Sequence, residues 1–202
     1  MDFDRLICRE LTPAESRKVY DSCLTRQFPP DEVKSYAVIQ RLRSRGMYLI
    51  YGLFAGDELL AYAFFARRRA GGELLMDYIA VLEPHQNRGL GSRFLALLAG
   101  VCGEHAAILA EVEDPDFAPD EAERRLRSRR VAFYLRNGFL DTGIRVTLFS
   151  VEYVILRHPL SEPAPEGGVW AALDAVYRAI LGDFYFREVD YRAKGDGDHA
   201  RP

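Results

Sequence analysis

Residues 78–92, YIAVLEPHQNRGLGS, decide the fold of this 202-residue chain. The run Tyr78–Val81 is typical of a strand, and Gly89 and Gly91 mark a turn into a helical apolar pattern that begins at Leu90. The first N–H groups of a helix have no carbonyl partner within the helix, and glycines leave them accessible. A strand, a glycine turn and a helix in this order therefore predict an anion site, most naturally for phosphate.

Three phosphate-binding patterns compete for this segment. A Walker A loop requires Gly-Lys-Ser/Thr, which does not follow here. A dinucleotide-binding fingerprint requires a third small residue where Phe94 stands, although Glu111 lies at a tolerable distance for a ribose contact. The third pattern fits best: Gln86–Gly91 resembles the central motif of the GNAT family of N-acetyltransferases, Gln/Arg-x-x-Gly-x-Gly/Ala, after a strand that ends in Ala80-Val81.

A second block of the same family, Tyr-x-x-x-Gly-Phe, appears as Tyr134–Phe139 at the end of a predicted helix. Two blocks in the right order are more specific than either alone, and the resemblance covers residues 1 to about 156. It implies an α/β fold with a mixed, mainly antiparallel central sheet of about six or seven strands flanked by helices, to which this chain adds a C-terminal helix.

The elements around the motif follow from hydrophobic periodicity and turn signals. Thr12 and Glu15 form a capping-box pattern at the start of the first helix, whose apolar face runs to Leu24. Further helices are predicted over residues 30 or 31 to 45, 90–102, 118 or 120 to 136, and 169–181. Strands are predicted over residues 6–11, 47–54, 58–65, 73–81, 106–112, 139–144 and 147–156.

The chain divides by composition into an acyl-transfer domain and an appendage. We expect a GNAT-like domain over 1–157, and a linker over 158–168, where HPLSEPAPEGG carries three prolines and two glycines. A C-terminal helical extension is expected over 169–191, with a short strand within 184–191, and a mobile tail over 192–202.

Charge and composition exclude several classes of function. Lys and Arg number 27 against 30 Asp and Glu, so there is no cationic excess for bulk nucleic-acid binding. No apolar stretch approaches the length of a membrane span, and the first ten residues show no signal region. Three scattered cysteines fit neither a disulfide framework nor a zinc site. We therefore expect a cytoplasmic protein that binds no metal.

The resemblance implies acetyl-CoA as co-substrate. It assigns the pantetheine arm to the backbone of Ile79, Ala80 and Val81, and the pyrophosphate to the segment Gln86, Asn87, Arg88, Gly89, Leu90, Gly91 and Ser92. One departure is that the family often has Asn, a pantetheine contact, where this chain has Arg127. Arg127 or Arg130 is instead available for a cofactor phosphate.

The chemistry requires a proton donor and a base. The resemblance assigns Tyr134 as donor to the departing thiolate. An amine with a pKa of about 10.4 must lose a proton near pH 7, at roughly 4.6 kcal/mol, so a base or a water relay has to help. Candidate carboxylates are Asp77 on the motif strand and Glu111 or Glu113 on the next strand, with Glu111 preferred and Asp77 close behind.

The predicted function is that of an acetyl-CoA-dependent N-acetyltransferase acting on a primary amine of a small molecule or peptide. The alternative is a non-catalytic acyl-CoA-binding or regulatory module on the same fold. The acidic stretch 111–120 is ordinarily a solvated strand end and loop, but over an acceptor channel it would attract cationic amines. A homodimer is left open.

Overall fold

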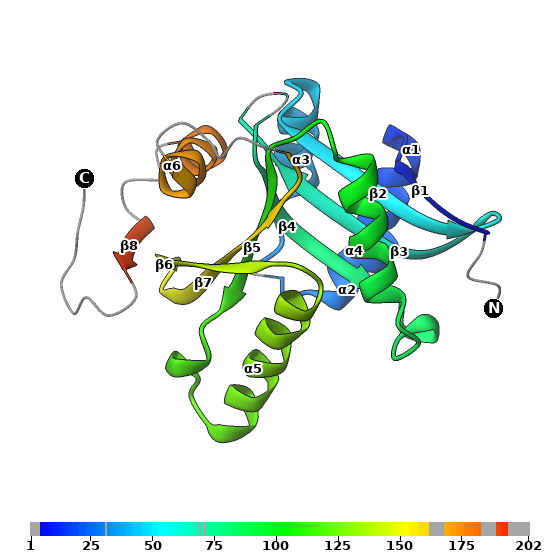
Figure 1. Ribbon diagram of the computed structural model, residues 1–202. Coiled ribbons are helices and arrows are strands. Elements are labelled where there is room, and N and C mark those ends of the chain that lie inside the picture. Colours follow the sequence, from blue (N-terminus) through cyan, green and yellow to red (C-terminus); the bar gives the residue numbers. More distant parts are fainter. Residues whose placement is uncertain are drawn as a thin grey trace.

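An eight-stranded sheet forms the centre of the molecule in the computed structural model, which describes residues 5–30, 32–68, 70, 72–161, 168–182 and 189–193 (Figure 1). The spatial order is β1-β2-β3-β4-β5-β7-β6-β8, and only β4 and β5 are parallel neighbours. The mixed, mainly antiparallel sheet is thus confirmed, with eight strands instead of six or seven. The strands are β1 (Leu6–Glu10), β2 (Tyr48–Ala55), β3 (Glu58–Ala66), β4 (Leu74–Val81), β5 (Ala107–Glu113), β6 (Leu140–Leu148), β7 (Val151–Pro159) and β8 (Val189–Ala193).

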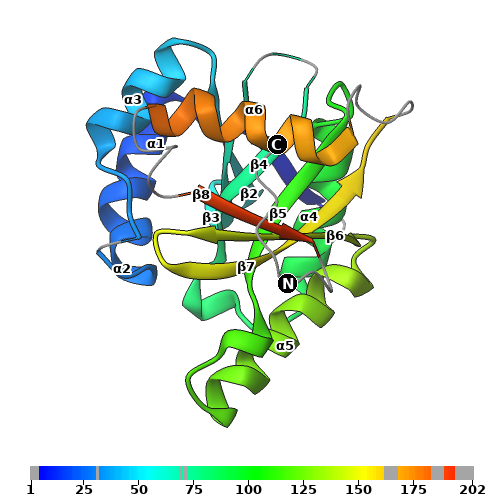
Figure 2. The same ribbon diagram turned by 90° about the vertical axis from the view of Figure 1, so that its left-hand side faces the viewer.

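Helices cover both faces of the sheet and create two cores (Figures 1 and 2). One face carries α1 (Pro13–Val19), a π-helical turn (Tyr20–Leu24), α2 (Thr25–Gln27), α3 (Tyr36–Ser44) and α6 (Gly168–Leu181). The opposite face carries α4 (Leu90–Val101) and α5 (Glu121–Arg136). Short 3₁₀ turns at Glu83–His85 and Pro115–Phe117 precede these last two helices.

In the N-terminal half the predicted strands and the first helix are confirmed, and the start predicted for the second helix is wrong. Thr12 and Glu15 form the expected capping box. The helix predicted from residue 30 or 31 begins only at Tyr36. Tertiary contacts explain the difference, because the Tyr78 hydroxyl donates to the Glu32 carbonyl and accepts from the Lys34 N–H. These bonds hold residues 32–34 against β4 in place of a first helical turn.

The C-terminal segment joins the main core. Leu173, Val176 and Tyr177 of α6 are buried in the same cluster as residues of β2, β3 and β5. Strand β8 pairs antiparallel with β6 from Leu148↔Val189 to Ile144↔Ala193. Most of the predicted strand 184–191 and tail 192–202 lies outside the described residues, but β8 spans the boundary between them.

Strands β4 and β5 separate at a defined point. They pair over only three positions, from Leu74↔Ile108 to Met76↔Ala110. Beyond that point β4 stays with β3 as far as Val81, while β5 stays with β7 as far as Glu113, so the strands run apart (Figure 1). We call the pair Met76 and Ala110 the divergence point and the space beyond it the β4–β5 gap.

Candidate active site

Backbone groups of β4 face the gap without a strand partner. The Leu82 N–H donates to the Leu60 carbonyl over 2.9 Å, and bonded pairs alternate along an antiparallel ladder. Ala80 therefore bonds to β3, whereas Ile79 and Val81 turn their groups away from β3, toward the gap. The carbonyl of Val81 accepts from the side-chain amides of Gln86 (3.0 Å) and Gln27 (3.3 Å). No strand among the described residues pairs with this side of β4 beyond Met76, so the Val81 N–H and both backbone groups of Ile79 are available to an extended ligand.

The glycine turn continues directly from this strand. Gly89 is the N-cap of α4 at φ +76°, a left-handed conformation that a side chain would strain. Arg88 and Ser92 are exposed, while Leu90 anchors the turn in the core. The predicted anion site is therefore an open helix N-terminus of a twelve-residue helix at the end of β4.

The hydroxyl of Tyr134 lies at the divergence point. It is 3.8 Å from Sδ of Met76, and its ring packs edge-on against Phe133 and Phe139. Burial raises the pKa of Tyr134 to about 12, and nearby Arg130 opposes this rise. The phenol is thus protonated throughout the physiological pH range.

Asp77, the next residue of β4, lies on the other face of the sheet from Met76 because strand residues alternate, and a bulge places Tyr78 on the same face as Asp77. Phe64 pairs with Tyr78 and Phe65 with Met76, so Asp77 is the extra residue. Its carboxylate, 9% exposed, contacts Nζ of Lys34 at 2.7 Å and accepts a hydrogen bond from the Tyr48 hydroxyl. Asp77 is therefore held in an ion pair and does not stand free.

Glu111 follows Ala110 on β5, and its side chain lies on the face of the sheet that α6 covers. Its carboxylate accepts a hydrogen bond from the Tyr177 hydroxyl of α6. Burial raises the pKa of Glu111 to about 7, the Asp77 charge adds to the rise, and Tyr177 and Lys34 oppose it. A carboxyl group with this pKa can accept a proton near neutral pH.

The three predicted catalytic residues thus converge on the divergence point from two sides. Tyr134 reaches it from the α5 face, whereas Asp77 and Glu111 flank it on the face that α3 and α6 cover. A group lying in the β4–β5 gap would have a hydroxyl donor on one side and two carboxylates on the other.

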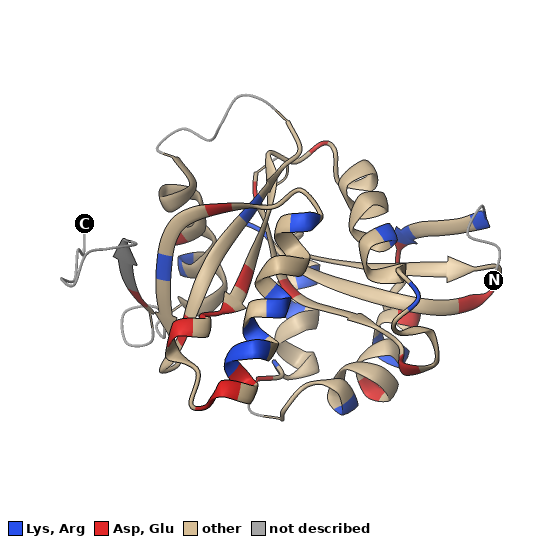
Figure 3. Cartoon of the chain, turned by 60° about the horizontal axis from the view of Figure 1, so that its bottom comes forward, with Lys and Arg blue, Asp and Glu red and all other residues tan. Residues whose placement is uncertain are grey.

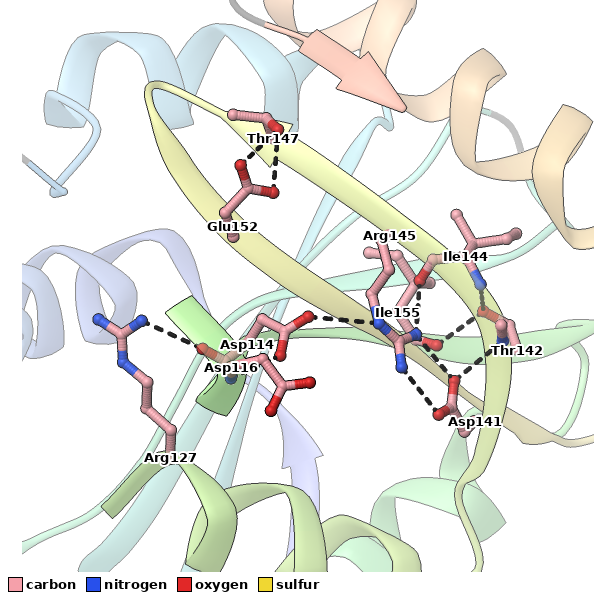
Figure 4. Close-up of polar contacts among 11 residues, drawn as sticks. Asp114, Asp116, Arg127, Asp141, Thr142, Ile144, Arg145, Thr147, Glu152 and Ile155 are labelled. Atoms are coloured by element: carbon pink, nitrogen blue, oxygen red, sulfur yellow. Dashed lines mark hydrogen bonds and ion pairs between the residues drawn. The ribbon is translucent and has the colours of Figure 1, made fainter. Parts of the chain in front are cut away.

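Two of the five acidic residues in the stretch 111–120, Glu113 and Asp114, pair with arginines of α5 and β6, on the charged side of the molecule seen in Figure 3; Figure 4 shows the contact of Asp114. Asp114 lies 3.4 Å from Nε of Arg145. Glu113, the third candidate base, contacts both Arg127 (2.9 Å) and Arg130 (2.7 Å). These pairings reduce the cation-attracting charge of the stretch at Glu113 and Asp114.

Arg127, which we expected as a phosphate ligand, is 11% exposed and has protein partners. Besides Glu113 it contacts Glu123 at 3.5 Å and the carbonyl oxygens of Asp114 (3.3 Å) and Phe117 (3.5 Å). It therefore ties α5 to the end of β5.

Sequence reasoning missed Lys34, Tyr48 and Tyr177. Tyr177 belongs to the predicted apolar face of α6, but nothing in the sequence pairs it with a residue 66 positions earlier. Among the described residues, no cluster of His, Cys, Asp or Glu could hold a metal ion. None of the described helices is both long and apolar enough for a bilayer crossing.

Comparison with known proteins finds one family model and several solved structures of similar fold. Residues 14–139 match the family model described as Acetyltransferase (GNAT) family. A putative GNAT-family acetyltransferase from Bacteroides thetaiotaomicron has a TM-score of 0.66 at 19% identity, covering 87% of this chain and 97% of that one. No curated protein matches in sequence.

Two further solved structures share the fold. The ribosomal-protein-S18-alanine N-acetyltransferase of Escherichia coli has a TM-score of 0.54 at 20% identity, covering 80% of this chain and 97% of that one. The spermidine N-acetyltransferase of Vibrio cholerae, in complex with CoA and spermine, has a TM-score of 0.53 at 14% identity, covering 76% and 95%.

Proposed function

This chain belongs to the GNAT family of acetyltransferases, and from that premise we propose that it transfers an acetyl group from acetyl-CoA to a primary amine of a small molecule or peptide. The observation that carries the proposal is the β4–β5 gap, which begins beside the Tyr134 hydroxyl and leads along free backbone groups of Ile79 and Val81 to the glycine turn.

The gap and the turn suit the two ends of the co-substrate. The Ile79 backbone and the Val81 N–H would pair with the pantetheine arm as a neighbouring strand does. The N–H groups between Arg88 and Ser92 would hold the pyrophosphate, helped by the positive end of α4. Acetyl-CoA, when bound, supplies the acetyl group as an activated thioester.

Tyr134 would donate a hydrogen bond to the sulfur of the departing thiolate. Full proton transfer from a phenol with a pKa of about 12 to a thiolate, whose conjugate thiol has a pKa of about 8.5, is uphill by roughly 5 kcal/mol. The hydroxyl therefore stabilises developing negative charge mainly as a hydrogen-bond donor.

Glu111 would take the proton of the attacking amine. Its pKa of about 7 leaves a substantial ionised fraction at neutral pH, while its proton affinity is higher than that of an ordinary carboxylate. Asp77, the second candidate base, is ion-paired with Lys34, so we assign the proton-accepting role to Glu111.

Release of free thiol from acetyl-CoA across a panel of primary amines tests the proposal. We expect amine-dependent turnover by the wild-type protein and none by Glu111→Gln. Coenzyme A binding, measured by calorimetry, distinguishes the alternative: a protein that binds coenzyme A but acetylates no amine is a binding module. The departure at Arg127 from the Asn common in the family is what keeps that alternative open.

A further inference from the structure

The C-terminal helix α6 reaches the proposed base. The Tyr177 hydroxyl donates to Oε1 of Glu111, and this helix lies outside residues 14–139, the part of the chain that matches the family model. We propose that Tyr177 is a positioning residue that orients the Glu111 carboxylate for proton acceptance, so that α6 is part of the acceptor side of the active site. This inference rests on the proposed function.

The aromatic ring of Tyr177 is rigidly placed. The residue is 1% exposed and packs in the core with Leu173 and Val176 of the same helix. A tyrosine has only two side-chain torsions, so packing of the ring fixes the hydroxyl position at low entropic cost. The hydroxyl can therefore hold one carboxylate oxygen in a single orientation.

The hydrogen bond from Tyr177 occupies only one of the two carboxylate oxygens of Glu111. Within the described residues no hydrogen bond reaches Oε2 of Glu111, and this oxygen is the one that an amine proton could reach. A hydrogen bond to Oε1 restricts rotation of the carboxylate, which lies one residue after Ala110 of the divergence point. The tyrosine thus acts on the reaction through Glu111 and need not touch the acceptor.

Other groups also set the protonation of Glu111. Asp77 of β4 disfavours its charge, Lys34 of the segment before α3 favours it, and Tyr153 of β7 lies close enough to interact. Because Tyr177 donates to the ionised form, loss of its hydroxyl should move the Glu111 titration to higher pH. The movement of the midpoint tests the hydrogen bond itself, and the pH profile of turnover tests whether that bond acts on the reaction.

The test compares Tyr177→Phe with Val176→Ala. The first removes only the hydroxyl, whereas the second deletes core methyl groups from the adjacent residue, which has no hydrogen bond to Glu111. Infrared difference titration of the carboxyl band, assigned by its absence in Glu111→Gln, measures the midpoint. We expect a rise of about one pH unit in Tyr177→Phe, since a hydrogen bond to a charged group contributes about that much, and no change in Val176→Ala.

Turnover separates this inference from the proposed function. With an amine that the enzyme accepts, the apparent pKa of the acidic limb of the kcat/KM profile should move to higher pH in Tyr177→Phe. The size of this shift should equal that of the infrared midpoint. An unmoved midpoint, an equal shift in Val176→Ala, or a shifted midpoint with an unmoved limb would each overturn the positioning role. Absence of turnover with every amine would instead refute the proposed function, while the infrared midpoint would still decide whether Tyr177 holds Glu111.

Discussion

The hydroxyl of Tyr134 lies 3.8 Å from Sδ of Met76, the last residue of β4 that pairs with β5. A helix on one face of the sheet thereby marks the place where the two parallel strands part. Asp77 and Glu111, each the next residue on its strand, take the opposite face. The separation of the strands and the convergence of the three polar groups are therefore one feature of the fold.

Tyr134→Phe should lower kcat by about 10²-fold, because donation to a leaving group contributes about that much. Its effect on stability should be small, since the hydroxyl makes only a long contact with a sulfur atom. Steady-state kinetics and thermal unfolding measure both. Tyr36→Phe, at an α3 hydroxyl that binds Pro13 and Gln40, is the matched control. Unchanged turnover in Tyr134→Phe would exclude Tyr134 as the donor.

Gly91→Glu should weaken coenzyme A binding by about tenfold or more, since a carboxylate at the helix N-terminus repels a phosphate. A Cβ at Gly91 would also lie 3.2 Å from the Phe133 ring. Gly100→Glu adds the same charge to the same helix at an exposed site with open space. Calorimetry should show normal binding for Gly100→Glu, and equal affinities for the two variants would place the phosphate site elsewhere.

Glu111→Gln should gain stability relative to the wild type as pH rises. Burial raises the Glu111 pKa from 4.5 to about 7, so between these values the folded state binds more protons than the unfolded state. The wild-type free energy of unfolding therefore falls over this window by up to about 3 kcal/mol, whereas below pH 4.5 the two proteins should differ little. Thermal unfolding between pH 4 and 8 checks this, with the exposed Glu83→Gln as control.

Arg127→Met should lower the free energy of unfolding by about 3 kcal/mol, because Glu113 and Glu123 would lose a largely buried partner. Arg125→Met, at a residue 75% exposed on the same helix, should cost less than about 0.5 kcal/mol. Urea unfolding gives both values. Coenzyme A affinity should be unchanged in Arg127→Met. A loss of affinity in Arg127→Met but not in Arg125→Met would show that Arg127 is a phosphate ligand after all.

The sequence by itself determined the local part of this site. A strand, a glycine turn and a helix follow from residues 78–92, because hydrophobic periodicity and the backbone freedom of glycine act over short distances. The mixed, mainly antiparallel sheet agrees with the family resemblance carried by that segment and by Tyr134–Phe139, although the sheet has eight strands and not six or seven. The sequence therefore predicted both the glycine turn and Tyr134, which lie at opposite ends of the β4–β5 gap.

Only the tertiary structure decided the partners of each charge. Lys34 meets Asp77 across 43 positions and Tyr177 meets Glu111 across 66, while Arg127 turns to Glu113. The physical reason is that a buried carboxylate must find a donor or cation wherever packing brings one, and packing of α3 and α6 on the sheet has no local code. The same packing raises the pKa of Glu111 to about 7, a change that its sequence context does not predict.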